Sequence, residues 1–505
     1  MSDILQMPDL APHKEVFAVL LEAEALADYP AECEIAAREV ADAVARSGRV
    51  LVVLDDDPTG TQSVADLPVL TRWDVEDFRW AFAARPGGSR PAAVYVLTNT
   101  RSLGPAEAAE RNRQVVASAT EAAEEAGVPL AFVSRSDSTL RGHFPLETDV
   151  LAEAIAAQGG KPVDGVVMVP AFPDAGRVTI GGEHYVRSGD GALTPVSETE
   201  FARDATFGFS TSYLPAYVEE KTAGRVRAAD VVVLDLGTIR AGAAAIADAI
   251  ARAHHGTPIV ADVTGENDLR ALALGLDEAE RRGASLLYRV GPPFVRGRIG
   301  QEVRAPLTAE DVYGDPASGG QREDLAAGGL IVVGSHVGLT TRQLERLTAQ
   351  HSSARTIEID VNELLDPQRA TGHLEATVGA VVRALADGDV ILHTSRVLVK
   401  DEDPAKSLEI ARTVSAAVVS VVNRVLAAAP PRFVIAKGGI TSSDVAAHGL
   451  EIRRAVVRGP MLPGIVSLWE PVDGPARGIP YIVFAGNVGD DESLAQVTRT
   501  LSTTF

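Results

Sequence analysis

One pattern recurs along this chain and constrains its fold most: a short apolar run, a polar or glycine-rich turn, and then an alanine-rich stretch with helical spacing. In the first part of the chain the apolar runs lie at residues 50–54, 94–97, 131–133, 165–169, 231–234, 259–261 and 286–290. Apolar runs that alternate with helices are typical of parallel strands buried on both faces of a sheet. The pattern therefore predicts an α/β fold with mainly parallel sheets flanked by helices.

The same pattern starts again after an interruption. Residues 313–329 are rich in Gly, Asp, Pro, Ala and Ser and have no apolar periodicity, as in a linker. Further apolar runs follow at 330–333, 356–359, 390–393, 433–436 and 481–484, and residues 407–428 predict a long helix. A chain of 505 residues is also too long for one hydrophobic core. We therefore predict two α/β domains, at 48–312 and 330–505, with linker 313–329 and an active-site cleft between the domains.

The N-terminus and the composition exclude several classes of protein. Residues 1–47 are predicted to be a helical extension, because 13–47 has apolar residues at helical spacing. The net charge of -22 works against non-specific binding to nucleic acid or to an anionic membrane. Cys33 is the single cysteine, which excludes a disulfide framework. No targeting sequence and no apolar run of about 20 residues is evident, so we expect a cytoplasmic protein with no membrane partner.

Three carboxylates follow the first predicted strand, in the turn Asp55-Asp56-Asp57-Pro58-Thr59-Gly60. Ligands bind at the carboxyl ends of the strands in open parallel sheets, so this turn is a candidate site. Such a cluster could hold Mg²⁺ or supply a base for a hydroxyl nucleophile. The same residues also suit a turn and helix cap without any chemical role.

Arginines and hydroxyls follow the next two strands. Arg101 lies in the turn after the second strand, and Asp137, Ser138 and Arg141 lie in the turn after the third. The planar arginine fork matches a carboxylate or a phosphate, and hydroxyls can hold the hydroxyls of a sugar. Each turn alone could be a cap, but together they would line one crevice that suits a polyhydroxy acid. Arg177 further along is a candidate contact or a structural residue, as is His184.

Two of these turns resemble a known family. The Asp-Asp-x-Thr-Gly turn at residues 56–60 and the Asp-Ser-Thr-Leu-Arg-Gly segment at 137–142 are similar to motifs of the four-carbon acid sugar kinase family, once catalogued as a domain of unknown function. The resemblance covers most of the chain from about Val50 onward. It implies an N-terminal domain that binds the acid sugar and a C-terminal domain that binds ATP. The terminal hydroxyl of threonate, erythronate or an oxo-tetronate would be phosphorylated.

The second half contains neither a Gly-x-x-x-x-Gly-Lys-Ser/Thr loop nor a Gly-x-Gly-x-x-Gly motif, so a nucleotide needs another cradle. Glycine-rich turns at residues 334–340, 437–444 and 485–489 are candidates, since glycine lets backbone N–H groups approach an anion. They could also be ordinary strand-to-helix turns. The family resemblance implies that ATP is held by Ser335, Gly438, Gly439, Ile440, Thr441 and Gly486. Lys437 is either a phosphate contact or a solvated charge, and residues 459–464 are interpreted as a rigid loop.

We therefore predict phosphoryl transfer from Mg·ATP to a primary hydroxyl of a four-carbon sugar acid. Asp56 or Asp57 is the expected base or metal contact, and Asp137 competes for that role. Arg101 and Arg141 are expected to clamp the substrate carboxylate. The remaining candidate substrate-binding residues are Thr59, Ser138 and Arg177. The ligands of the metal are left open.

Alternatives remain at this point. Fold alone does not fix chemistry, so a ligase or another ATP-dependent enzyme acting on a hydroxy acid is possible, although the missing Gly-x-Gly-x-x-Gly argues against a dehydrogenase. A non-catalytic protein that binds a sugar acid and a nucleotide is the alternative outside enzymes. The expected partners are the acid and ATP, with no nucleic acid, and a homo-oligomer is left open.

Overall fold

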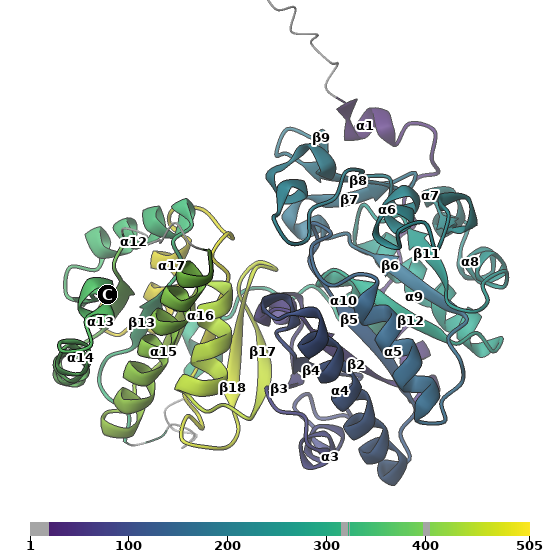
Figure 1. Ribbon diagram of the computed structural model, residues 1–505. Helices are drawn as coiled ribbons and strands as arrows, with labels where there is room; N and C mark the ends of the chain where they lie inside the picture. The colour runs from purple at the N-terminus through teal and green to yellow at the C-terminus, as the bar shows by residue number, and fades with distance from the viewer. Residues whose placement is uncertain (1–19, 315–321, 323, 397–403) are drawn as a thin grey trace, which may run out of the picture.

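The computed structural model describes residues 20–314, 322, 324–396 and 404–505 (Figure 1). Parts of two predicted segments, the N-terminal extension and the linker, lie outside the described residues. In the N-terminal half, all seven predicted strands form and pair in parallel, with an eighth, β3, at the edge. In sheet order they are β10 (Val232–Leu234), β11 (Thr257–Ala261), β6 (Gly165–Val169), β12 (Leu286–Val290), β5 (Leu130–Arg135), β2 (Val50–Asp55), β4 (Ala93–Leu97) and β3 (Leu67–Leu70).

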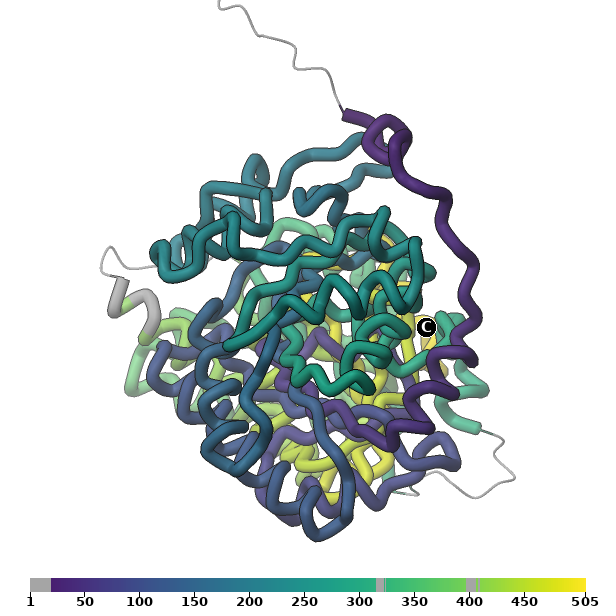
Figure 2. The backbone as a smooth tube through the Cα atoms, turned by 90° about the vertical axis from the view of Figure 1, so that its right-hand side faces the viewer, coloured from purple at the N-terminus to yellow at the C-terminus, as the bar shows by residue number. Residues whose placement is uncertain are grey.

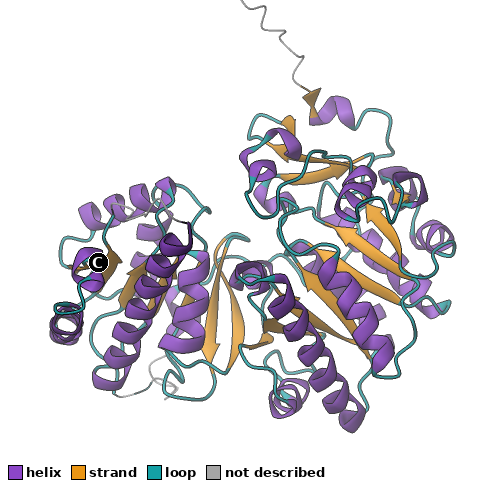
Figure 3. Ribbon diagram, viewed as in Figure 1, coloured by secondary structure: helices purple, strands orange, loops and turns teal. Residues whose placement is uncertain are grey.

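Helices cover both faces of this sheet, as the α/β prediction requires (Figure 3). The helices of this half that have eight or more residues are α2 (Ala37–Ser47), α3 (Val75–Ala83), α4 (Pro105–Ala126), α5 (Leu146–Ala157), α6 (Leu214–Lys221), α8 (Ala243–Ile250) and α9 (Glu266–Arg281). Strand side chains alternate between two buried clusters. Val53 and Tyr95 point into the larger core, while Val52 and Val94 pack toward α3 and α4. The strands are therefore buried on both faces, which explains their continuous apolar runs.

The N-terminal extension is only partly helical. After β1 (Leu20–Leu21) and α1 (Glu22–Ala25), the chain runs without regular structure until α2. Figure 2 follows this segment down one side of the N-terminal half. The prediction of a helix across this stretch is wrong, and Pro30 is one reason, because proline removes a helix hydrogen bond. Strand β1 instead completes a small antiparallel sheet with β9 (Ala192–Pro195), β8 (Glu183–Arg187) and β7 (Arg177–Ile180).

The C-terminal half repeats the parallel design. Its parallel strands are β19 (Tyr481–Phe484), β16 (Val434–Lys437), β13 (Leu330–Val333), β15 (Val390–Thr394) and β14 (Arg355–Ile359). Its longer helices are α12 (Gly338–Gln350), α14 (Ala370–Leu385), α15 (Pro404–Ala428) and α17 (Ser493–Leu501). An antiparallel hairpin, β17 (Arg454–Leu462) and β18 (Val466–Pro471), was not predicted. The interpretation of 459–464 as a loop is wrong at residues 459–462, because register shifts around Gly459 and Pro460 accommodate both residues within β17.

The two halves share one sheet. Strand β17 pairs antiparallel with β3, in the register Arg454 to Leu70 and Val457 to Leu67, and joins both parallel sheets into a single 15-stranded sheet. The junction is visible between the two lobes in Figure 3. The halves are therefore joined edge to edge by backbone hydrogen bonds as well as by the linker.

A buried carboxylate reinforces this junction. Asp77 of α3 is fully buried, and its Oδ1 accepts hydrogen bonds from Arg453 Nε at 2.6 Å and Arg454 Nε at 2.9 Å. We expect Asp77→Ala to lower the free energy of unfolding by about 2–3 kcal/mol, because it leaves two arginines without their buried partner. Glu125→Ala is the matched control, since it removes an exposed ion pair with Arg79 and should cost less than about 1 kcal/mol. Thermal denaturation of both variants checks this, and equal melting temperatures would contradict it.

Helix α15 contains a segment, Glu409–Ala428, that is long and apolar enough by length and composition to cross a membrane, with a mean hydropathy of 1.4. The core helix of a soluble protein passes the same test. Val418, Val421 and Val425 of this segment belong to the main buried core. The segment is therefore weak evidence for a membrane span.

Candidate functional site

A cavity of about 650 Å³ is lined by side chains and backbone from both halves of the chain. The residues predicted from sequence that line it are Asp57, Thr59, Arg101, Asp137, Ser138, Arg141, Arg177, Ser335, Gly439 and Gly486. They come from turns at the carboxyl ends of β2, β4, β5, β13, β16 and β19 and from the start of β7. The structure thus brings acidic and arginine-rich turns of one half together with glycine-rich turns of the other.

Four other predicted residues do not line this cavity: Asp56, Gly438, Ile440 and Thr441. Asp56 is buried, and its two carboxylate oxygens accept hydrogen bonds from Arg101, at 3.1 Å from Nε and 2.6 Å from Nη2. This pairing makes Asp56 a partner of Arg101 within the wall. Ile440 lies in the short helix α16 (Gly439–Asp444) and is 60% exposed.

The floor of the acidic turn is a buried ion pair between Asp55 and Arg135. Burial raises the pKa of Asp55 to about 7, although the neighbouring Arg135 guanidinium opposes this effect. Arg135 also donates to the backbone oxygen of Asp57. Gly60 packs over the pair so closely that a Cβ there would lie 2.4 Å from the Asp55 carboxylate. The turn therefore requires glycine at this position.

The acidic turn is also attached to the C-terminal half. It continues into a short 3-10 helix, Pro58–Ser63, which carries Thr61. Trp469 Nε1 on β18 donates to Thr61 Oγ1 at 2.8 Å, and Ser467 Oγ lies 2.9 Å from the same hydroxyl. All three side chains are buried. This contact fixes the acidic turn relative to the strands that carry the glycine-rich turns.

Asp57 places an ionised carboxylate at the junction of the halves. Burial alone would raise the pKa of Asp57, but Arg101, Arg135 and hydrogen bonds from Thr59 outweigh it and lower the pKa overall. Its Oδ1 accepts from Thr59 N at 3.0 Å, and its Oδ2 lies 3.8 Å from Arg101 Nη1. A Cβ added to Gly439 would lie 3.0 Å from that same Oδ2. The free side of the carboxylate thus faces the glycine-rich turn at residues 437–444 of the other half.

The opposite wall holds Asp137 and two arginines. Burial would raise the pKa of Asp137, but Arg101 and Arg141 hold it well below its usual range, and Arg141 Nε donates to Asp137 Oδ2 at 2.6 Å. The guanidinium carbons of Arg141 and Arg177 lie 5.1 and 6.0 Å from the centre of the Phe201 ring. Arg177 Nε is buried and, among the residues that the structure describes, has no hydrogen-bond partner. An anion could supply that partner.

His184 has a structural role. Its ring is fully buried, with Nδ1 2.9 Å from Thr179 Oγ1 and Nε2 2.8 Å from the carbonyl oxygen of Ser138. Burial lowers the pKa of His184 to about 4, so the ring is neutral at physiological pH. It therefore supports the Ser138 turn from behind, in agreement with the structural alternative.

The glycine-rich turns of the C-terminal half converge on one another. A Cβ on Gly334 would lie 2.3 Å from Thr441 Oγ1, and a Cβ on Gly486 would lie 2.8 Å from Ser335 Oγ. Gly438 has a φ of +131° and also packs against Ser335. These close approaches explain why glycine occupies the three turns, and they bring three separate sequence motifs into one cluster.

Lys437 is a buried side chain and not a solvated charge. It is fully buried at the end of β16, where its Nζ donates to the carbonyl oxygen of Ala485 at 2.6 Å and lies 4.0 Å from the centre of the Phe484 ring. Burial lowers the pKa of Lys437 to about 7. The lysine at this position therefore contacts the backbone behind a glycine-rich turn.

The burial of Lys437 is expected to lower the stability of the folded state by an amount that depends on pH. Because the pKa of Lys437 is about 7 when folded and about 10.5 when unfolded, the folded state binds fewer protons in that interval. Stability therefore rises with pH from about 7 to 10.5, and the cost of Lys437 is complete below pH 7. We expect Lys437→Met to raise the free energy of unfolding at pH 6 by about 1–3 kcal/mol, less than the full shift because a hydrogen bond is lost. Denaturation between pH 6 and 10 should show this advantage shrinking, and a constant difference would contradict the assignment.

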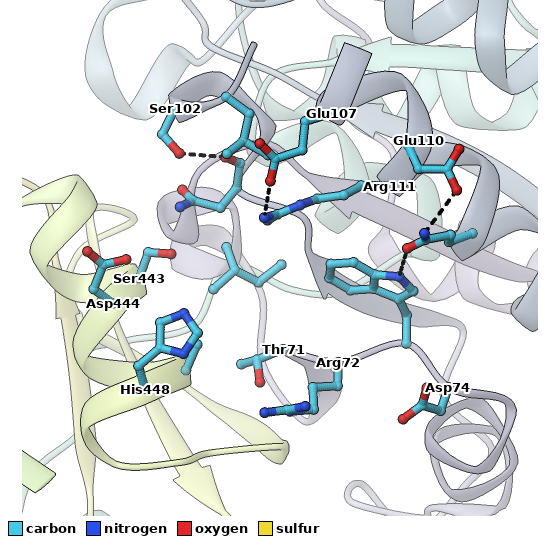
Figure 4. Close-up of a pocket in the computed structure, with 16 residues that line it drawn as sticks. Thr71, Arg72, Asp74, Ser102, Glu107, Glu110, Arg111, Ser443, Asp444 and His448 are labelled. Carbon is cyan, nitrogen blue, oxygen red and sulfur yellow. Dashed lines mark hydrogen bonds and ion pairs between the residues drawn. The ribbon is translucent and has the colours of Figure 1, made fainter. Parts of the chain in front are cut away.

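A second cleft, of about 630 Å³, lies between α4 and the segment that follows the Gly438 turn (Figure 4). Arg111 there donates to Glu107 Oε1 at 2.8 Å and to the carbonyl oxygen of Thr98 at 2.8 Å. Ser443, Asp444 and His448 face it from the C-terminal half. Ser443 and Asp444 end the predicted turn 437–444, and no other predicted site residue lines this cleft.

Some residues of the main cavity were not predicted to have a role. Arg135, Gln62 and Phe201 line it, and Gln343 lies behind the last glycine-rich turn. Thr340 also lies behind that turn, but it belongs to the predicted candidate turn 334–340. Phe201 lies in a short 3-10 helix, Glu200–Arg203, after β9, with no motif around it. Arg135 is the last residue of β5, directly before the third turn, so proximity to Asp137 in sequence was the only available signal.

Comparison with known proteins also separates the chain into an N-terminal and a C-terminal half. Residues 51–298 match a family model described as a sugar-binding N-terminal domain, and residues 330–494 match one described as a nucleotide-binding C-terminal domain. D-erythronate kinase of Heliobacterium modesticaldum is 28% identical over 344 residues, 68% of this chain and 70% of that protein. D-threonate kinase of Cupriavidus necator is 29% identical over 270 residues, 52% of this chain and 55% of that protein.

Solved structures share the fold. A Salmonella typhimurium LT2 protein described as a tRNA synthase superposes with a TM-score of 0.63 at 20% identity, over 90% of this chain and 100% of that one. A Haemophilus influenzae protein superposes with a TM-score of 0.58 at 17% identity, over 89% and 100% of the two chains. The matched domains, the kinase relatives and the motifs that line the shared cavity together show that this chain belongs to the four-carbon acid sugar kinase family.

Proposed function

We propose that this protein transfers the terminal phosphoryl group of ATP to the terminal hydroxyl of a four-carbon sugar acid of the threonate, erythronate or oxo-tetronate type. The observation that carries the proposal is the single cavity lined by Asp57, Asp137 and arginines from one half and by Ser335, Gly439 and Gly486 from the other. Phosphoryl transfer depends mainly on positioning and charge stabilisation. A cavity that holds both reactants between two joined halves supplies that positioning.

The acid end of the substrate is assigned to Arg177 and Arg141. Arg177 has a buried Nε without a partner among the described residues, and both guanidiniums are supported by Phe201. A carboxylate bound there would gain a charge-assisted hydrogen bond. Arg101 already donates to both oxygens of Asp56, so its role is to orient the acidic turn. Thr59 and Ser138 offer hydroxyl groups to the sugar in the same cavity.

Asp57 is assigned as the base that orients the acceptor hydroxyl. It is ionised, its Oδ1 is held by Thr59, and its Oδ2 faces the glycine-rich side of the cavity. As the hydroxyl oxygen bonds to the γ-phosphorus and the bond to the β–γ bridging oxygen breaks, the hydroxyl proton passes to Asp57 and ADP leaves. Asp137 already accepts from Arg141 and Thr139, so it stabilises charge in the wall.

Magnesium is expected to accompany ATP. Among the described residues no group of three or more His, Cys, Asp or Glu side chains could hold a metal by itself. Mg²⁺ at nucleotide sites is commonly held by one or two carboxylates together with phosphates and water. Asp174, which lines the same cavity, fits that mode of binding and would hold the ion together with the phosphates, while Asp57 remains the base. When bound, the ion would neutralise phosphate charge during transfer.

The test is an ADP-release assay on purified protein with ATP, Mg²⁺ and a panel of tetronates, oxo-tetronates and five- and six-carbon acids. We expect ADP release above background with at least one four-carbon acid and weaker release with the longer acids. Background release with every acid in the panel would overturn the proposal.

A further inference from the structure

The loop at residues 485–490, between β19 and α17, has its carbonyl groups bound by buried side chains. Lys437 Nζ donates to the oxygen of Ala485 at 2.6 Å, and Thr340 Oγ1 donates to that of Gly486 at 2.8 Å. Gln343 Nε2 donates to two more, at 3.1 Å for Val488 and 2.6 Å for Asp490. Lys437, Thr340 and Gln343 are each 0% exposed. Three buried side chains from β16 and α12 thus donate hydrogen bonds to four carbonyl groups of this loop.

The consequence is a set of outward-facing N–H groups. In a trans peptide the N–H of one residue points opposite to the carbonyl of the residue before it. With those carbonyls turned toward α12 and the end of β16, the N–H groups of Gly486, Asn487 and Gly489 turn the other way, and all three residues line the main cavity. Within the described part of the chain, none of these N–H groups donates a hydrogen bond. A short run of free backbone N–H groups is a binding surface for an anion.

The glycines of the loop make this surface accessible. A Cβ on Gly486 would lie 2.8 Å from Ser335 Oγ, so a larger residue would push the loop away from the turn that carries Ser335. Gly489 has a φ of +82°, in the region that favours glycine, and a Cβ there would lie 2.4 Å from Ser493 Oγ. The loop conformation is therefore determined both by its glycines and by the side chains behind it.

We propose that Thr340, Gln343 and Lys437 are positioning residues that hold the 485–490 loop as a preformed cradle for the phosphate groups of the nucleotide. The proposal rests on the proposed function. The three side chains bond to carbonyl groups of the loop from α12 and from the end of β16, and they act through the backbone alone. Their contribution is preorganisation: a loop already held in its binding conformation loses less entropy when the anion binds.

Calorimetric titration with ADP tests this with a matched pair of variants. Thr340→Val removes the hydroxyl without changing the shape, and it should raise the Kd for ADP about tenfold. Thr340→Ser keeps the hydroxyl and should restore binding to within about threefold. Thr498→Val is the control, because Thr498 Oγ1 is equally buried but donates to Leu494 within helix α17. That variant should bind ADP like the unsubstituted protein.

The variant Lys437→Met distinguishes an effect on the position of the 485–490 loop from an effect on the stability of the protein. The variant is expected to unfold at a higher temperature at pH 6–7 and yet to bind ADP more weakly, whereas a purely structural role would change neither affinity nor the KM for the acid. The KM for the sugar acid should stay unchanged in both Thr340→Val and Lys437→Met. Gln343→Met provides a third measurement if Thr340→Val does not fold.

The outcomes distinguish this inference from the proposed function. Binding of ADP by the unsubstituted protein, with an unchanged Kd in folded Thr340→Val and Lys437→Met, would overturn the positioning role alone. Failure of the unsubstituted protein to bind ADP would overturn the proposed function itself. Weaker binding in these variants with normal binding in Thr340→Ser and Thr498→Val would support the cradle.

Discussion

Replacing Asp57 by asparagine should lower kcat by about 10²- to 10⁴-fold, the range for loss of a general base. Asparagine has nearly the same shape, and its side-chain oxygen can still accept the hydrogen bond from Thr59 N that Asp57 Oδ1 accepts at 3.0 Å. The turn should therefore keep its structure while it loses the group that takes the proton. Steady-state kinetics with a four-carbon acid, together with ADP binding, measures both effects, and the Kd for ADP should change little.

Asp137→Asn is the companion variant, because Asp137 is the competing candidate for the base. Asp137 is paired with Arg141, so its replacement should disturb the acid-binding wall and raise KM for the acid. If Asp57→Asn retained the turnover of the unsubstituted protein while Asp137→Asn lost it, the assignment of the base would be reversed.

Arg177→Met should raise the KM for the sugar acid by about 10- to 100-fold, since a charge-assisted hydrogen bond contributes about 1.5–3 kcal/mol. Methionine keeps much of the apolar contact with Phe201 but removes the buried Nε that lacks a partner among the described residues. The Kd for ADP should stay the same, because Arg177 belongs to the wall formed by the N-terminal half. Initial rates at varied acid and saturating ATP measure the effect.

Arg225→Met is the control for Arg177. Arg225 is an exposed arginine of the same half, ion-paired with Asp149 at 2.6 Å, and it does not line the cavity. Its replacement should leave KM unchanged. An equal KM for the acid in Arg177→Met and in the unsubstituted protein would show that the carboxylate binds elsewhere.

The parallel strands could be predicted because burial on both faces leaves a direct trace in the sequence. Strands such as β4 and β13 are continuous apolar runs, and all their residues are buried. The β17–β18 hairpin leaves no such trace, since Gly459 and Pro460 lie within β17 and are typical of loops. The pairing of β3 with β17 joins segments almost 400 positions apart in the sequence. No local pattern encodes that contact, so the single continuous sheet could not be foreseen.

The candidate site, like the sheet, could be predicted only where it depends on local sequence patterns. Polar turns after predicted strands suggested that Asp57, Asp137 and Arg141 lie together, because the carboxyl ends of parallel strands share one edge, and all three line the main cavity. The sequence could not show that Arg101 would pair with Asp56, or that Phe201, in a short 3-10 helix, would lie against two arginines. It also could not show that Lys437 points inward to a backbone carbonyl. These details depend on packing between distant segments.

The central claim is that one cavity holds a nucleotide and a sugar acid for direct transfer between them. The most direct test is identification of the products of a reaction with ATP, Mg²⁺ and a four-carbon acid by ³¹P NMR and mass spectrometry. We predict equimolar ADP and an acid that carries one phosphate on its terminal oxygen. Release of ADP with inorganic phosphate, while the acid stays unmodified, would contradict the claim.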